Sequence, residues 1–200
     1  MVERKFGEQL YIGILSSLAS AIRNISESVE SAGDENFLEE INNKWINHNK
    51  ALNMIQDVLL HMDKNFIKKT QGTKTIHEIG FRRWMDSVIG SEKIRKRLPD
   101  KLVQLVLSER KGEVINTGLT GKIIKMLMDL GMPVYEKNFK KPFLLAFDDF
   151  YGSESQGLIN SVDCENYLME VEKRMNEEWG RVSCYLDPSS ESTIIRLRLA

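Results

Sequence analysis

Histidine is the side chain that most often serves as a general base or a metal ligand near neutral pH, and this chain has three: His48, His61 and His77. A metal pair on one helix needs two histidines about four residues apart, and no two of these are that close. His48 falls on an apolar helical stripe, which favours a buried or rim position over a ligand or a base, whereas His61 falls off that stripe. The sequence contains no Walker A, GxSxG, HExxH or GxGxxG pattern. We therefore expect no catalytic residue, no metal site and no cofactor.

Adjacent carboxylates are the second group of residues that could do chemistry, as general acid and base. They occur at Glu39–Glu40, Asp148–Asp149 and Glu177–Glu178. Neighbours on a helix point about 100° apart, so the two members of a pair cannot act on one substrate. We interpret all three pairs as solvated helix faces.

The charge balance excludes several kinds of partner. Lys and Arg number 28 and Asp and Glu 29, a net charge of −1 that predicts no nucleic-acid surface. The basic cluster Lys93, Arg95, Lys96 and Arg97 has no interleaved aromatic residue, so we interpret it as solvated.

Apolar and cysteine content point to a cellular compartment. The longest apolar stretches, such as Phe143–Phe147, fall far short of the roughly 20 residues that span a bilayer, so we expect no membrane insertion. We find no secretory signal. Cys164 and Cys184 lack metal-ligand spacing, and we expect reduced thiols in a protein of the cytoplasm, the nucleus or both.

Helices must position all of these side chains. Residues 38–66 carry apolar or histidine side chains at alternating spacings of three and four: Leu38, Ile41, Trp45, His48, Leu52, Ile55, Leu59, Met62 and Phe66. A coiled coil is the alternative, but neighbouring helical segments favour packing inside one bundle. Glycine and proline are too few for an all-β fold. The sequence predicts an all-α chain of about seven helices in antiparallel bundles, and an irregular tail over residues 188–200.

Seven segments resemble, in the same order, the amino-terminal stalk of the cullin family. The similarity is greatest to the type-three subfamily, which pairs with BTB-domain adaptors, and within it to plant members. The segments are Lys5–Tyr11, Phe37–Ile55, Met62–Asp63, Glu109–Ile115, Val134–Leu144, Phe150–Gln156 and Tyr167–Asp187.

The resemblance implies a fold and a role. It implies cullin repeats, helical bundles that form part of an elongated stalk, with an incomplete first repeat at residues 1–70 and most of a second at 74–187. It also implies a non-catalytic scaffold of a ubiquitin-ligase complex in ubiquitin-dependent protein degradation. By the same resemblance, the adaptor-side helix carries the partner-binding residues Asp57, His61 and Lys64, and His61 stands where the family usually has a tyrosine.

Both ends of the family's pattern fall outside this sequence. The first helix and the start of the second would precede Met1, so we expect weakened binding of BTB-domain adaptors, and the missing carboxy-terminal half implies no RING protein. Three functions remain open: a scaffold fragment, a competitive regulator that sequesters adaptors or other partners from a full-length cullin, and a diverged duplicate without activity. The stripe Leu10, Ile14, Leu18 and Ile22 would lose partners, so we also expect self-association.

Overall fold

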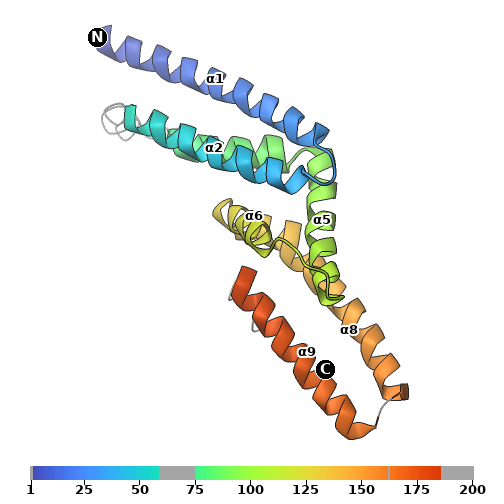
Figure 1. Cartoon of the computed structure of the whole chain (residues 1–200). Coiled ribbons are helices and arrows are strands. Elements are labelled where there is room, and N and C mark those ends of the chain that lie inside the picture. The colour runs from blue at the N-terminus through green and yellow to red at the C-terminus, as the bar shows by residue number, and fades with distance from the viewer. Residues whose placement is uncertain (1, 59–74, 162, 186–200) are drawn as a thin grey trace. The chain divides into compact units, whose positions relative to one another are not determined.

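The computed structural model describes residues 2–58, 75–161 and 163–185, and within these ranges the chain is helical with short turns and contains no strand (Figure 1). The all-α prediction is confirmed. The α-helices are α1 Val2–Ser31, α2 Phe37–Val58, α4 Ile76–Trp84, α5 Glu92–Arg110, α6 Thr117–Asp129, α7 Met132–Tyr135, α8 Lys141–Ser161 and α9 Cys164–Tyr185, and two π-helical turns, η2 Met85–Ile89 and η3 Glu136–Lys140, continue α4 and α7. None of the described helices has the length and apolar character needed to cross a membrane.

The chain divides into two compact units, Met1–Arg97 and Leu98–Ala200, and the division falls within α5. The repeat boundaries at residues 70 and 74 stay a prediction. The irregular tail predicted for residues 188–200 lies outside the described residues.

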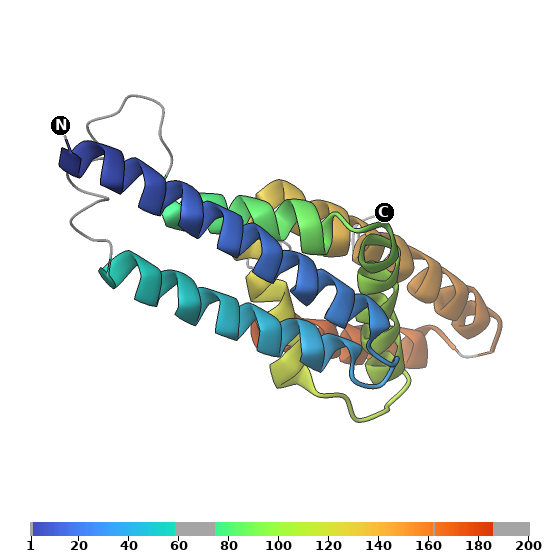
Figure 2. The ribbon, with the colours of Figure 1, turned by 90° about the horizontal axis from the view of Figure 1, so that it is seen from above.

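In the first unit, α1 and α2 run side by side and pack together with α4 and η2 (Figure 2). The stripe predicted on residues 38–66 is the reason for this packing. Its members from Leu38 to Leu52 are buried and Ile55 is half-buried, whereas Leu59, Met62 and Phe66 lie outside the described residues. On α1, Leu18 and Ile22 are buried, so these two residues of the predicted exposed stripe have partners within the unit.

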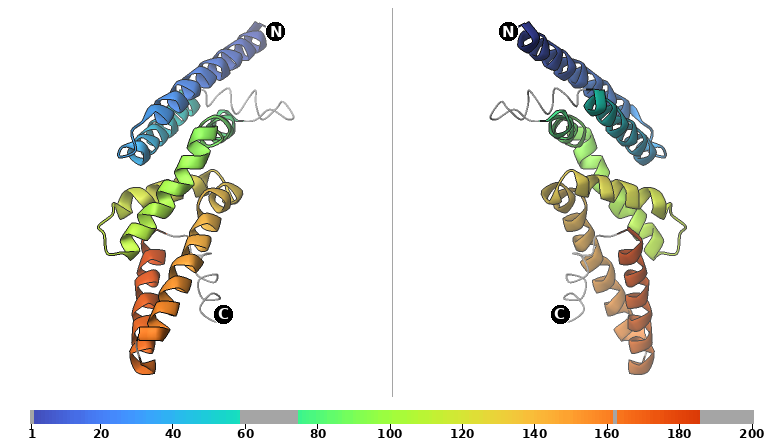
Figure 3. Two further views of the ribbon diagram at one scale, coloured as in Figure 1. Left: turned by 90° about the vertical axis from the view of Figure 1, so that its right-hand side faces the viewer. Right: turned by 90° about the vertical axis from the view of Figure 1, so that its left-hand side faces the viewer.

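In the second unit, α8 and α9 lie beside each other, and α6 packs on α9 (Figure 3). Gly131 has φ of +122°, which few other residues adopt, and it separates α6 from α7, where Pro133 stands in the first turn. Phe139, Phe143 and Phe147 are buried, with ring centroids 5.5 Å and 6.4 Å apart along the series. These phenylalanines form part of the core of the second unit.

Gly80 of α4 lies at a close approach between α4 and α2. An added Cβ would lie 2.5 Å from Cδ2 of Leu52, whose side chain is fully buried and has little room to move. We predict that Gly80→Ala lowers the free energy of unfolding by about 1–2 kcal/mol, because overpacking outweighs the gain in helix propensity. Urea unfolding followed by circular dichroism measures the change.

Gly13→Ala is the matched control. Gly13 lies in α1 with open space around its Cβ position, so this change should leave stability unchanged or raise it by up to about 1 kcal/mol. Equal stabilities of the two variants would contradict the close approach.

Candidate partner-binding surface

The structure places one of the three predicted partner-binding residues. Asp57 is exposed in the last turn of α2. His61 and Lys64 lie outside the described residues, so the proposed grouping of the three side chains stays a prediction.

An aromatic cluster fixes α2 against α4. The rings of Trp45 and His48 on α2 each lie 5.1 Å, centroid to centroid, from the ring of Trp84 on α4. His48 Nε2 donates to the carbonyl oxygen of Gly80 at 3.3 Å, since a carbonyl can only accept. The expectation of a satisfied core histidine is confirmed: His48 is 4% exposed.

The surroundings of His48 keep it neutral. Burial lowers its pKa below the ordinary value of 6.5, and the nearby His77 acts in the same direction, whereas the hydrogen bond to Gly80 opposes them. A neutral imidazole serves here as a packing group with one hydrogen bond. It has no carboxylate or nucleophile beside it among the described contacts, so nothing in this cluster resembles a catalytic pair.

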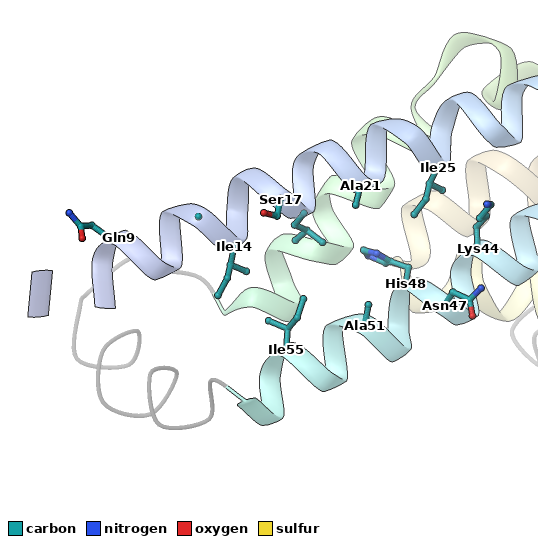
Figure 4. A pocket seen from close by; sticks show the side chains of 12 residues that line it. Gln9, Ile14, Ser17, Ala21, Ile25, Lys44, Asn47, His48, Ala51 and Ile55 are labelled. Carbon is teal, nitrogen blue, oxygen red and sulfur yellow. The ribbon is translucent and has the colours of Figure 1, made fainter. Parts of the chain in front are cut away.

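A groove with a volume of about 630 Å³ opens between α1 and α2 (Figure 4). Its walls are aliphatic or small, from Ile14, Leu18, Ala21 and Ile25 on α1 and Ala51 and Ile55 on α2. Among the described residues that line it, only Lys44 and His48 are ionisable. Such a surface suits apolar side chains of a protein partner better than a polar substrate.

A buried ionic network joins three helices of the second unit. The carboxylate of Glu178 on α9 accepts hydrogen bonds from Arg110 Nε on α5 at 2.8 Å, from the Tyr151 hydroxyl on α8 at 2.7 Å, and from Arg181 Nη1 at 2.8 Å. The Arg110 guanidinium also lies 5.2 to 5.7 Å from the centroids of four aromatic rings. The rings belong to Phe143, Phe147, Phe150 and Tyr151.

This network controls the protonation of its members. Burial by itself would raise the pKa of Glu178, but the hydrogen bonds and charge of Arg110, with help from Tyr151 and Arg181, hold that pKa below its ordinary value of 4.5. Burial and the Glu178 charge both raise the pKa of Tyr151. Glu178 is therefore ionised and Tyr151 is a neutral donor at neutral pH.

The interpretation of Glu177–Glu178 as a solvated face is wrong for Glu178, which is 2% exposed. The physical reason is the 100° rotation between neighbours, which turns one carboxylate inward while Glu177 stays half-buried beside Arg174. A signal was available in the sequence. Glu178 continues the helical spacing of Val171, Met175 and Val182, as Arg110 continues that of Leu98, Leu102 and Val106.

The other charged clusters are mostly solvated, as expected. Asp148, Asp149 and Glu39 are exposed, while Glu40 is half-buried and accepts a hydrogen bond from Ser28. In the basic cluster, Lys93, Arg95 and Lys96 are exposed.

Arg97 departs from the interpretation of that cluster as solvated. Its Nη2 lies 2.6 Å from Oδ1 of Asp34, and its guanidinium stands 4.0 Å above the ring of Phe37. Arg97 therefore fastens the start of α5 to the α1–α2 turn. Because Asp34 and Phe37 both contact it, we assign Arg97 a structural role in the first unit.

A second depression, of about 460 Å³, lies beside the Glu178 network. Arg110, Arg174 and Arg181 line it, but carboxylates occupy them: Arg174 Nη2 donates to Glu154 at 2.7 Å, and Arg181 lies 3.7 Å from Glu109. We interpret this region as an ionic network, in which one buried nitrogen of each arginine, Arg110 Nη1, Arg174 Nε and Arg181 Nε, has no hydrogen-bond partner in the described part of the chain. Among the described residues, no group of three or more His, Cys, Asp or Glu side chains is placed to hold a metal, and Cys164 and Cys184 are free and exposed.

Comparison with known proteins places these features in a family context. The model of the Cullin alpha solenoid domain matches residues 1–198. The chain is 48% identical to Cullin-3A of Arabidopsis thaliana over 97% of this chain and 26% of that protein. It is 38% identical to Cullin-3 of Dictyostelium discoideum over 96% of this chain and 25% of that protein. The chain thus spans about a quarter of the length of the curated relatives it matches.

Removing the charge of Glu178 should destabilise the second unit strongly. We predict that Glu178→Gln lowers the free energy of unfolding by about 3–5 kcal/mol at pH 7, because Arg110 is left buried without a counter-charge. Urea unfolding monitored by circular dichroism measures the loss. Glu177→Gln, on the same helix and partly exposed, should cost less than about 1 kcal/mol. Equal losses would show that Glu178 has no special role.

The pH dependence of stability should show the protonation of His48. Because its pKa is lowered in the folded chain, the unfolded chain binds a proton first as the pH falls through 6.5, and the free energy of unfolding decreases. The free energy of unfolding should fall by at most about 1.4 kcal/mol for each pH unit. His48→Phe should flatten this slope between pH 7 and 5.5, whereas His77→Gln should retain it. A slope that survives His48→Phe would place its origin elsewhere.

Proposed function

Because the chain belongs to the cullin family, we propose that it is a non-catalytic scaffold segment of a ubiquitin-ligase complex, and that it binds a protein partner rather than a substrate. The observation that carries the proposal is the 48% identity to Cullin-3A over 97% of the chain. A scaffold of this kind contributes by holding its partners close together, which raises their effective concentration.

Rigid helices support such a role. The Glu178 network ties α5, α8 and α9 together, and the His48 cluster ties α2 to α4. Each cluster buries a polar group that is satisfied only in one arrangement of its helices, which penalises local rearrangement within its own unit. A partner held by either unit therefore meets a preformed surface.

We assign the adaptor-facing side to Asp57, near the C-terminal end of α2, and to His61 and Lys64 further along the sequence, with a BTB-domain protein as the adaptor. Asp57 supports the assignment because it is exposed. In this proposal the segment binds no RING protein, so an isolated copy that occupied an adaptor would compete with a full-length cullin. We propose the cytoplasm, the nucleus or both as its location, in keeping with two free thiols.

Binding of purified BTB-domain adaptors tests the proposal. We predict measurable binding by isothermal titration calorimetry, with an affinity that falls about tenfold or more for Asp57→Lys, because charge reversal at an interface leaves a repulsive or unpaired group. Asp148→Lys is the matched control, since Asp148 is exposed in the second unit and should leave the affinity unchanged. Absence of binding across a panel of adaptors would contradict the assignment, and so would stable binding of a RING-box protein.

A further inference from the structure

One face of α2 carries a row of exposed side chains outside the core of its unit. Asn47, Lys50, Met54 and Asp57 follow one another at spacings of three, four and three, so they lie along a single stripe of the helix. Met54 stands at the middle of the stripe with 69% of its surface exposed. A methionine so placed, with a charge on either side, has the pattern of a helix–helix contact.

The open groove borders this stripe. Asn47 and Ala51 line the groove (Figure 4), and helical spacing puts Met54, three residues after Ala51, next to this lining on α2. The small side chain of Ala51 leaves space between its neighbours on α2. The same surface therefore carries a protruding apolar side chain and a hollow that can receive one.

The stripe carries two side chains of opposite charge, Lys50 and Asp57. Lys50 and Asp57 are exposed, and neither forms an ion pair with another residue in the described ranges, whereas nearby Lys44 lies 3.3 Å from Glu40. Lys50 precedes Met54 by four residues and Asp57 follows it by three. When two copies of α2 meet in opposite directions around Met54, each Lys50 therefore faces an Asp57.

We propose that a second copy of this chain docks on the stripe, with the two α2 helices antiparallel about a twofold axis beside Met54. The stripe is complementary to itself in both shape and charge, as an isologous interface requires. A parallel arrangement would set Lys50 against Lys50 and Asp57 against Asp57, so the charges select the antiparallel one. The two Met54 side chains then meet at the axis.

Sedimentation equilibrium of the purified full chain at low ionic strength, without adaptor, tests the pairing. The unaltered chain should form a dimer that weakens with added salt. Lys50→Asp and Asp57→Lys should each raise the dimer dissociation constant by about tenfold or more, because two attractions become two repulsions. Combining both changes in one chain should restore the dimer. This restoration separates a lost contact from a misfolded variant.

Cross-linking locates the axis independently. In a chain carrying Cys164→Ser and Cys184→Ser, Met54→Cys should form an intermolecular disulfide under mild oxidation, because the two Cβ atoms meet at the axis. Asn53→Cys, exposed and one residue away, is the matched control and should not. A chain that stays monomeric at all concentrations would overturn the proposal, as would a dimer indifferent to the charge changes or an equal yield from both cysteines.

Discussion

The second unit depends on one buried carboxylate. Glu178 receives hydrogen bonds from α5, α8 and its own helix, and Arg110 and Tyr151 would lose this partner if the three helices moved apart. A buried ion pair adds little net stability, because desolvation offsets most of the attraction. Its effect is on uniqueness, since the carboxylate receives Arg110, Tyr151 and Arg181 together only when α5, α8 and α9 are packed in this arrangement. The aromatic rings around Arg110 complete the site, with the Phe143 and Phe150 centroids 5.2 Å and 5.7 Å from the guanidinium.

In the first unit, a neutral side chain, His48, favours one arrangement of α2 and α4. His48 stacks on Trp84 and donates to the Gly80 carbonyl at the place where the lack of a Cβ lets Leu52 approach. This contact buries one face of α2 against α4. Among the described residues, the other faces of α2 border the groove and carry the exposed Met54 stripe, so α2 is both a structural element and the best candidate for partner binding.

Much of the fold could be predicted from helical periodicity alone. The alternation of threes and fours from Leu38 to Leu52 corresponds to the buried side of α2, and the aromatic series from Phe139 to Phe147 corresponds to the core of the second unit. Which charged residues are buried could not be predicted from residue type, because a charged side chain on a helix is usually exposed. Glu178 and Arg110 both occupy stripe positions, and each is buried because the other neutralises it across a distance of 68 residues in the sequence. Of the predicted contact residues, only Asp57 lies in the described part of the chain, and nothing in the fold tests its role.

The sequence by itself determined the helical class, the absence of a recognisable catalytic motif and the resemblance to cullins, because spacing and residue type are local properties that the chain carries unfolded. Tertiary structure decided which charges are buried, which neighbour of an acidic pair turns inward, and which face of α2 remains open. Those outcomes depend on side chains brought together from distant positions, as Arg110, Tyr151 and Glu178 are. The free energy of a buried charge is set by its partners, and the partners exist only after the helices have packed.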